Sequence, residues 1–561
     1  MCGICGIKSV DASVEIENNF SKMLKSLHHR GPDYQDYYTD KYLYLGSTRL
    51  KILDLDDRSN MPMQFDDYII IFNGEIYNHQ ILRLALKERG EIFQTTSDTE
   101  VVLRLFKHYN VDAFKMLEGM FAICIYSIKD KKIYLARDVF GIKPLYYCFY
   151  NKSFIFASEI KSIANSFGNS FSKNYFAIYS YLAKGSIIEP QTQYNNIFSL
   201  LPGNVMIIQD NLDYNIREFE TVCSIIKDSE NTNISYSKEY FFSELNRHVT
   251  AHTQSDVPIS LMLSSGIDSM YLNQVLGDYI TRFTTSYNFC INTYDDEIAE
   301  IKKNFDLKNH ITNYFTNNDI SDIKNNFQKL SDTLAIDGVQ FLLISKFIKE
   351  NNFKVVLAGF GADEIFNSYP TYKYLRFFNN INKNIPNFMS HLFNFKNYKI
   401  QKLKNLLFHS SSLERMYLNF RSIFFKNEIF DILGKNIEEY DRYLLKQTTK
   451  YTKDIIFWTN KVKSLEINLF LKDQVLKDLD WASMRYSLEI RVPFLSKSLL
   501  KMSASQSLVN TLCKNDLFFY SNLNKSNYHI NYKKRGFSTP DSILKSQRDF
   551  VLSNYSNFIN S

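Results

Sequence analysis

The pattern of apolar and polar positions divides the chain into three regions. Up to about residue 200, short apolar runs such as 68–72 are separated by polar turns, which is typical of strands. From about residue 237, apolar runs that end in small-residue loops alternate with stretches at helical spacing, as in α/β proteins. After about residue 370 the pattern is mostly helical, and its Phe, Tyr and Leu stripes predict a buried core more than a cofactor site.

The pattern also predicts where one domain ends and the next begins. Leu200–Gly203 is a predicted turn, and residues 210–235 are mostly polar without Gly or Pro. A chain of 561 residues is too long for one ordinary core. We therefore expect a link in this region between two domains, at residues 2–205 and 225–561.

Composition then narrows the class of protein. Hydrophobic residues make up 45% and charged residues 22%, which is a soluble globular balance. The net charge of +6 is spread out, and the small cluster Lys533-Lys534-Arg535 is no long basic run, so no nucleic acid partner is expected. The apolar runs are too short for a membrane span or a signal peptide. Seven cysteines, an odd number, make no disulfide framework, so we expect a cytoplasmic protein.

Cys2 is the first candidate for chemistry. Removal of Met1 would leave Cys2 with a thiol and a free α-amine, and such an amine, with a pKa of roughly 7.7–8.0, can serve as the base for its own thiol. Cys2 and Cys5 also have the spacing of a redox or metal motif. No second paired cluster with zinc-ligand spacing follows, so we interpret Cys2 as a nucleophile that carries its own base.

Six motifs follow Cys2 in a fixed order. They are His29-Arg30-Gly31-Pro32-Asp33, the segment around Arg49, Asn73-Gly74-Glu75-Ile76-Tyr77-Asn78, Ser97-Asp98-Thr99-Glu100, Gly119-Met120-Phe121-Ala122 and the segment from Arg137 to Tyr147. Ser97 has the type and place of a helix cap. In this order the motifs closely resemble the class II glutamine amidotransferase domain, an N-terminal-nucleophile glutaminase with an αββα sandwich, over about the first 160 to 200 residues.

This resemblance implies a role for each candidate residue. Cys2 would attack the side-chain amide of glutamine, and the Asn73 side chain and the Gly74 N–H would bind the oxyanion. Arg49, Glu75 and Asp98, together with Asn73, would hold the glutamine, because an arginine fork suits a carboxylate and acids suit an ammonium. Each charged residue alone could be an ordinary surface residue, and the motif context favours the binding role.

A second group of motifs lies in the α/β region. The predicted strand 258–263 runs into Ser264-Ser265-Gly266-Ile267-Asp268-Ser269, where loop N–H groups and hydroxyls can bind phosphate. Alone, such a loop could be an ordinary strand–helix connection. It resembles the pyrophosphate loop of ATP pyrophosphatases, usually S-G-G-x-D-S, with Ser265 in place of a glycine.

The predicted strand 354–358 leads into a second loop, Gly359-Phe360-Gly361-Ala362-Asp363-Glu364. The resemblance implies that Asp268 and Asp363 bind Mg²⁺, which prefers carboxylate and phosphate oxygens. Glu364 and Lys514 are less certain residues of this synthetase site, and Phe289 could equally be a core aromatic. The implied ATP-binding residues are Leu263, Ser264, Ser265, Gly266, Asp268, Ser269, Phe289, Ala358 and Gly359.

The C-terminal signature extends the resemblance to essentially the whole chain. Residues 477–484 and 487–495 closely resemble the helical signature of glutamine-hydrolysing asparagine synthetases, and residues 534–540 resemble the last recurrent segment of that family. The resemblance implies a second, Rossmann-like ATP-pyrophosphatase domain with a parallel sheet and a helical C-terminal part. Arg485, Glu489 and Arg491 could be structural ion pairs or substrate contacts.

The family chemistry is the ATP-dependent amidation of a carboxylate through an acyl-adenylate, with AMP and pyrophosphate released. Glutamine would supply ammonia through an internal channel, and aspartate is the default acceptor. The oligomeric state stays open, with a homodimer as one option.

Departures from the family pattern fall on the synthetase half. Phe360 stands where an acid is usual, Phe518 replaces the arginine of a K-x-x-L-R segment, residues 366–369 replace F-G-G-Y, and Ser496 replaces a common Asp. One alternative is therefore the same chemistry on another carboxylate, such as a sugar uronic acid in surface-polysaccharide synthesis. A further alternative is a glutaminase or binding protein with an inactive synthetase half, against which the intact Asp268, Ser269 and Asp363 argue.

Overall fold

The computed structural model describes residues 2–11, 14–291, 293, 296–382, 398–435, 437–520 and 547–560. The sequence motif at 534–540 and the basic cluster at 533–535 lie outside these residues.

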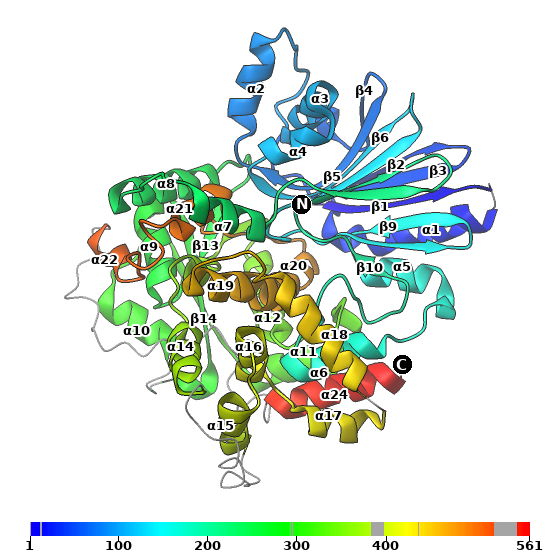
Figure 1. Ribbon diagram of the computed structural model, residues 1–561. Coiled ribbons are helices and arrows are strands. Elements are labelled where there is room, and N and C mark those ends of the chain that lie inside the picture. The colour runs from blue at the N-terminus through cyan, green and yellow to red at the C-terminus, as the bar shows by residue number, and fades with distance from the viewer. Residues whose placement is uncertain are drawn as a thin grey trace.

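Two antiparallel sheets face each other in the N-terminal half (Figure 1). Buried apolar side chains fill the space between them, such as Ile4 from the first sheet and Ile71 from the second. The first sheet has the order β10-β8-β9-β1-β3-β2, from β1 (Cys2–Ser9), β2 (Tyr34–Asp40), β3 (Leu43–Arg49), β8 (Tyr146–Tyr150), β9 (Ser153–Ala157) and β10 (Phe198–Ser199). The second has the order β12-β11-β7-β6-β5-β4, from β4 (Met63–Phe65), β5 (Tyr68–Ile76), β6 (Gly119–Ser127), β7 (Lys132–Arg137), β11 (Asn204–Ile208) and β12 (Tyr214–Glu218).

Helices cover the outer face of each of these sheets. α1 (Val14–Ser26) and α5 (Ile160–Ser166) pack on the first sheet. α2 (His79–Glu88), α3 (Asp98–Tyr109) and α4 (Ala113–Met116) pack on the second, and Ser97 caps α3 by accepting a hydrogen bond from the Thr99 N–H. The layer order helix, sheet, sheet, helix confirms the predicted αββα sandwich.

A third, parallel sheet forms the centre of the second half. Its order is β15-β14-β13-β16-β17, and the predicted strands at 258–263 and 354–358 are its neighbours β13 and β16. Its strands are β13 (Ile259–Met262), β14 (Thr281–Tyr287), β15 (His310–Phe315), β16 (Val355–Leu357) and β17 (Glu489–Arg491). Because parallel strands end at the same edge, the loops after β13 and β16 meet there, where α/β sheets bind ligands.

Helices surround this sheet and form the rest of the chain, as the helical spacing after residue 370 predicts. From just before β13 to just after β16 they are α8 (Lys238–Ala251), α9 (Ile267–Leu276), α10 (Glu297–Asn304), α11 (Asn317–Leu330), α12 (Gly338–Glu350) and α13 (Ala362–Ile365). The C-terminal ones are α14 (Pro370–Asn382), α15 (Tyr398–Phe408), α16 (Leu413–Arg421), α17 (Lys426–Leu433), α18 (Glu438–Lys450), α19 (Trp458–Leu465), the π-helical η8 (Glu466–Leu476), α20 (Lys477–Met484), α21 (Lys497–Ala504), α22 (Asp516–Phe519) and α24 (Gln547–Asn560).

The polar segment 210–235 is more than the link that its composition indicates. It contains β12, which pairs with β11 at the edge of the second sheet, and α7 (Val222–Asn231), which packs in the core of the second half. All five residues of β12 are exposed, so an edge strand here has the composition of a linker. The two domain boundaries themselves stay a prediction.

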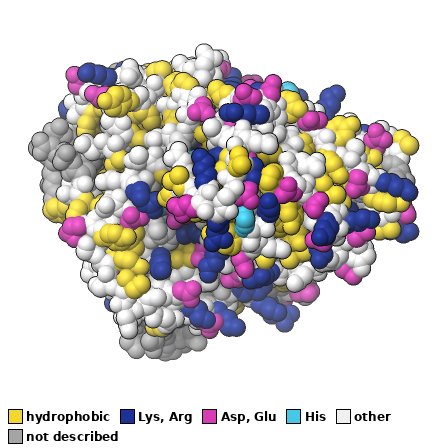
Figure 2. Space-filling view, turned by 90° about the horizontal axis from the view of Figure 1, so that it is seen from above, with side chains coloured by type: hydrophobic (Ala, Val, Ile, Leu, Met, Phe, Trp, Pro, Cys, Tyr) yellow, Lys and Arg dark blue, Asp and Glu magenta, His cyan; other side chains and the backbone are white. Residues whose placement is uncertain are grey.

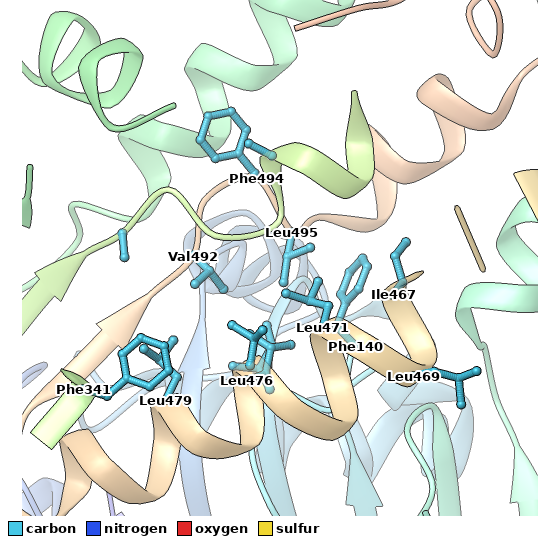
Figure 3. Packing of buried hydrophobic residues seen from close by; sticks show 14 of the residues in the cluster. Phe140, Phe341, Ile467, Leu469, Leu471, Leu476, Leu479, Val492, Phe494 and Leu495 are labelled. Carbon is cyan, nitrogen blue, oxygen red and sulfur yellow. The ribbon is translucent and has the colours of Figure 1, made fainter. Parts of the chain in front are cut away.

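The two halves share one buried core. α6 (Tyr175–Lys184) follows the sandwich in the chain but packs against α16, α17, α18 and α24. Figure 3 shows Phe140, from the loop after β7, beside Ile467 and Leu471 of η8. On the face seen in Figure 2, basic and acidic side chains are interspersed. Within the described residues, none of the helices has both the length and the hydropathy needed to cross a membrane.

Candidate active sites

Cys2 lies at the start of β1, buried between the sheets and α3. Its register partner on β3 is Arg49, and its backbone N–H donates to Asn73 Oδ1 at 3.1 Å. Burial raises the pKa of the Cys2 thiol, against the opposing effect of nearby positive charge that includes Arg49. A buried thiol with a raised pKa needs a base to become a nucleophile, which is what the predicted use of its own amine would supply. The structure therefore brings Cys2, Arg49 and Asn73 together, as the sequence predicts.

The next two residues of interest, Asn73 and Gly74, lie side by side on β5. Asn73 Nδ2 is buried and has no hydrogen-bond partner, so it is a donor that can serve an oxyanion. Gly74 has no room for a side chain, because a Cβ there would lie 2.0 Å from the carbonyl oxygen of Met120 on β6. Only glycine allows this close approach of β5 to β6 beside the thiol.

The three charged residues predicted to hold glutamine are all buried. Arg49 is fixed by the loop after β3, where it donates to the Asp56 carbonyl at 3.1 Å and to Asn60 Oδ1 at 2.7 Å. Asp98 begins α3 and accepts from the Ile76 N–H at 2.9 Å. Burial raises the pKa of both Glu75 and Asp98, and each acid lies near the other. Glu75 Oε1 has no partner, so it can accept from an ammonium.

Arg491 is a residue of this site whose role the sequence leaves open between an ion pair and a substrate contact. It ends β17 in the parallel sheet, yet its Nη2 lies 3.1 Å from Glu75 Oε2 in the sandwich, and its Nε lies 2.5 Å from Glu489 Oε1. Its backbone carbonyl accepts from the Ala358 N–H at 2.9 Å. Arg491 is therefore an ion-pair residue that joins Glu75, which is predicted to hold glutamine, to the loop after β16, which is predicted to bind ATP.

A second buried ion pair crosses between the halves under the nucleophile strand. Arg30 donates to Asp480 of α20 at 2.8 Å, to Glu159 at 3.0 Å and to the Cys2 carbonyl at 3.3 Å. Lys143 also lies 3.4 Å from Asp480. Sequence reasoning missed these contacts, although Arg30, Lys143 and Asp480 all stand inside the motifs that it singled out.

The loop after β13 has the conformation of a closed turn at the start of α9. The Ser269 hydroxyl lies 2.9 Å from the Ser264 hydroxyl and donates to the Ser264 carbonyl at 2.8 Å. The departure at Ser265 has a visible partner, because its N–H and hydroxyl both donate to Glu297 Oε1, at 2.8 and 2.9 Å. The added side chain thus fastens the loop to α10.

The two loops touch at the predicted metal residues. A Cβ on Gly359 would lie 3.0 Å from the Asp268 Cβ. Lys514 Nζ forms an ion pair with Asp268 and lies 2.7 Å from Asp363 Oδ1. Burial alone would lower the pKa of Lys514, but the two carboxylates outweigh burial and raise it. Two carboxylates beside a phosphate-binding loop are a donor set that fits Mg²⁺ shared with phosphate oxygens, although within the described residues no three His, Cys, Asp or Glu converge.

The predicted adenine residues occupy two kinds of environment. Leu263 and Ala358 are buried directly after β13 and β16. Phe289 stacks on Tyr287 at a ring distance of 5.4 Å and remains 42% exposed, so it is no core aromatic and its face is available to a base.

The departures from the family pattern also have partners. Phe360 packs edge-on against Phe341 at a ring distance of 5.7 Å, and Phe518 packs against the core. The Ser496 hydroxyl caps α21 and lies 2.9 Å from His248 Nε2. Glu364 is buried beside Asp363, and burial, followed by that neighbouring charge, raises its pKa to about 8.

Comparisons with known proteins match both halves of the chain. Residues 1–219 match the family described as "Glutamine amidotransferase domain", and residues 241–510 match "Asparagine synthase". The glutamine-hydrolysing asparagine synthetase 1 of Bacillus subtilis is 28% identical over 564 residues, covering 96% of this chain and 87% of that protein. A relative from Methanocaldococcus jannaschii that also carries an asparagine synthetase name is 30% identical over 405 residues, covering 66% of this chain and 76% of that one.

Asparagine synthetase B of Escherichia coli is 26% identical over 392 residues, which cover 66% of this chain and 65% of the relative. The matches cover both halves of the chain. They therefore support a glutaminase domain and an ATP-dependent synthetase domain, which together make a ligase. The chain belongs to the family of glutamine-hydrolysing asparagine synthetases.

Proposed function

We propose that this ligase converts aspartate to asparagine, with glutamine as the nitrogen donor and MgATP as the activating substrate. The observation that carries the proposal is the convergence of Lys514 on Asp268 and Asp363, because it places a cation and two carboxylates at the mouth of a phosphate loop. An inactive synthetase half would have no reason to keep these three groups together.

The glutaminase half would use residues that the fold already gathers. The Cys2 thiol gives its proton to the α-amine and attacks the glutamine amide carbon. Asn73 Nδ2 and the Gly74 N–H stabilise the resulting oxyanion. Arg49 holds the α-carboxylate, while Glu75 and Asp98 hold the ammonium. Collapse of the intermediate breaks the C–N bond, returns the proton to the leaving nitrogen and releases ammonia. Water then hydrolyses the thioester on Cys2, which releases glutamate and restores the thiol.

The synthetase half would activate the acceptor. A carboxylate oxygen of the acceptor attacks the α-phosphorus of ATP, and the bond to pyrophosphate breaks. The loop 264–269 holds the phosphates, Leu263, Phe289, Ala358 and Gly359 hold the base, and Lys514 stabilises the developing negative charge. Asp268 and Asp363 would hold Mg²⁺, and the ion would supply positive charge for the phosphates. Ammonia then attacks the acyl carbon, and AMP leaves.

The two reactions would be joined by ammonia inside the protein. Ammonia in water at neutral pH is mostly ammonium, which is no nucleophile, so a dry route between the sites is required. The shared core around Phe140, together with Arg30 and Arg491, supports a closed interface between the halves.

Phe360 is the observation that favours a second candidate, in which the same chemistry acts on another carboxylate such as a sugar uronic acid. A phenylalanine packed on Phe341 can neither ionise nor bind a metal at the reacting centre.

The test is a product assay on the purified protein with ATP, Mg²⁺, glutamine and one acceptor at a time. Asparagine and AMP formed in equal amounts from aspartate would support the proposal. Pyrophosphate released with a uronic acid but not with aspartate would favour the second candidate. Glutamate formation without pyrophosphate release for any acceptor would contradict both.

A further inference from the structure

A group of buried and half-buried polar side chains begins next to Asp363, and none of the reaction steps proposed above uses it. We call it the Arg421 cluster; its members come from α13, α14, α16 and η8, and they are Glu364, Tyr372, Tyr417, Arg421 and Glu466. Glu364 is adjacent in the chain to Asp363, so the cluster begins where the proposed metal and phosphate contacts end.

One carboxyl oxygen of each acid in the cluster is held by hydrogen bonds. The Tyr369 hydroxyl donates to Glu364 Oε1 at 2.9 Å. The Tyr417 hydroxyl donates to Glu466 Oε2 at 3.1 Å, and Arg421 Nη2 lies 2.5 Å from the same oxygen. The central carbon of the Arg421 guanidinium lies over the Phe470 ring, 3.9 Å from its centre. These groups are therefore oriented by the fold.

The other half of the cluster lacks partners. Four buried atoms have no hydrogen bond: Glu364 Oε2, the Tyr372 hydroxyl, Arg421 Nε and Glu466 Oε1. Tyr369 brings them near one another. Its ring lies 5.3 Å from the Arg421 guanidinium, its hydroxyl is bonded to Glu364, and its backbone carbonyl accepts from the Tyr372 N–H at 3.2 Å. Buried polar atoms in folded proteins nearly always have partners, so four orphans in one place point to a ligand.

The chemistry of the orphans specifies the ligand. Arg421 Nε and the Tyr372 hydroxyl are donors suited to a carboxylate, whereas the free oxygens of Glu466 and Glu364 are acceptors suited to an ammonium. A free amino acid carries both groups on one carbon. A uronic acid has a carboxylate and hydroxyls but no ammonium to donate to these two acceptors. The Arg421 side chain is 22% exposed although its Nε is buried, so this arginine lies between the cluster and solvent.

We propose that the Arg421 cluster binds the α-amino and α-carboxylate groups of an amino acid acceptor, with its side-chain carboxylate directed toward Asp363 and Lys514. This assignment rests on the proposed function for its place in the reaction. It adds the residues that select an amino acid, and it can be tested separately by binding alone.

The first experiment measures binding without turnover. Aspartate and succinate, which lacks only the ammonium, are titrated calorimetrically into the whole protein with Mg²⁺ and a non-hydrolysable ATP analogue. We expect aspartate to bind at least about tenfold more tightly than succinate, the effect of one charge-assisted hydrogen bond. Equal affinity for the two, or no binding of either, would overturn the assignment.

The second experiment tests the residues. Tyr372→Phe removes an unpartnered hydroxyl and leaves the packing intact, so the variant should fold; Tyr374→Phe, on the exposed face of the same helix, is the matched control. We expect Tyr372→Phe to raise the Kd for aspartate and its KM in pyrophosphate release about tenfold, with the KM for ATP unchanged. Equal values for both variants would overturn the assignment.

The outcomes also separate this assignment from the proposed function. If the wild-type protein binds aspartate and Tyr372→Phe weakens that binding, yet no pyrophosphate is released, the site stands and the proposed reaction fails. If asparagine forms and Tyr372→Phe does not change the aspartate KM, the reaction stands and the site falls.

Discussion

At the scale of single residues, Cys2 combines burial with a neighbouring oxyanion donor. Burial raises the pKa of its thiol, so the thiol depends on a base, while the orphan Asn73 Nδ2 is directed at no other group. Both features belong to a site that is prepared for a substrate before the substrate binds.

We therefore expect Cys2→Ala to reduce glutamine-dependent asparagine formation by about 10³-fold or more, because the nucleophile is lost. Asn73→Ala should reduce the glutaminase kcat by about 10²–10³-fold, the usual loss for one oxyanion donor. Steady-state assays with glutamine and with ammonium chloride measure both. The ammonia-dependent rate should survive in each variant, and its disappearance with Cys2→Ala would contradict two separate sites.

Glu364 gives a residue-scale prediction about pH. Burial raises its pKa to about 8 from an ordinary value of 4.5, so the folded state holds a proton that the unfolded state releases. Its contribution to stability is then fully present below pH 4.5 and is lost as pH rises toward 8. A glutamine side chain does not ionise, so it makes no pH-dependent contribution of this kind. Glu364→Gln should match the wild type near pH 4.5 and exceed it near pH 8 by at least about 1.4 kcal/mol, the value of one pKa unit.

Urea denaturation at the two pH values measures this difference. Glu88→Gln, on the exposed side of α2, is the control and should leave the pH profile of stability unchanged. A profile for Glu364→Gln that runs parallel to the wild type would show that Glu364 is ionised in the folded protein.

At the scale of elements, Gly203 shows how a single turn fixes the junction between strands and linker. It stands between β10 and β11 with φ of +70°, and a Cβ there would lie 1.8 Å from the carbonyl oxygen of Glu220. Gly434 also has a positive φ, of +59°, but has open space where a Cβ would be. Substitutions at the two glycines therefore distinguish the cost of backbone strain from the cost of a steric clash.

Gly203→Ala should lower the free energy of unfolding by more than Gly434→Ala, which should show only the left-handed strain of about 1–3 kcal/mol. The collision adds to that strain, because the obstacle is backbone and cannot rotate away. Urea unfolding of both variants measures the difference. If both variants lose the same stability, the backbone at Glu220 must move aside without lowering the free energy of unfolding. The close contact between Gly203 and Glu220 would then not require glycine.

The strands and loops that carry the sites could be predicted because each has a local signal. The apolar runs at 68–72, 258–263 and 354–358 became β5, β13 and β16, and the motifs placed Cys2, Asn73 and Asp363 on or just after strands. β12 could not be predicted, since an exposed edge strand shares its composition with a linker. The Arg421 cluster could not be predicted either, because its members come from four elements that meet only in the folded chain.

At the scale of the whole molecule, buried charged side chains connect the two halves. Arg491 is fully buried and contacts Glu75 with its guanidinium, while its backbone carbonyl accepts from the Ala358 N–H beside the nucleotide loop. Its Nη1 also donates to the carbonyls of His252 and Gln254, each at 2.7 Å. One residue therefore contacts both an acid of the proposed glutamine site and the start of the loop that is proposed to bind the nucleotide.

The contacts between the halves use several N–H groups of the Arg491 guanidinium at once, so Arg491→Lys should weaken them. A lysine is a single charge at the end of a flexible stem and cannot reach Glu75, Glu489 and two carbonyls together. We expect the KM for glutamine to change about tenfold, the effect of one buried charged contact, and more glutamate to form per asparagine. The ammonia-dependent rate should stay near that of the wild type.

Arg485→Lys, at a half-buried arginine of the same segment, is the control. An Arg491→Lys protein that folds, binds glutamine normally and keeps a one-to-one ratio of glutamate to asparagine would show that this ion pair only supports the interface.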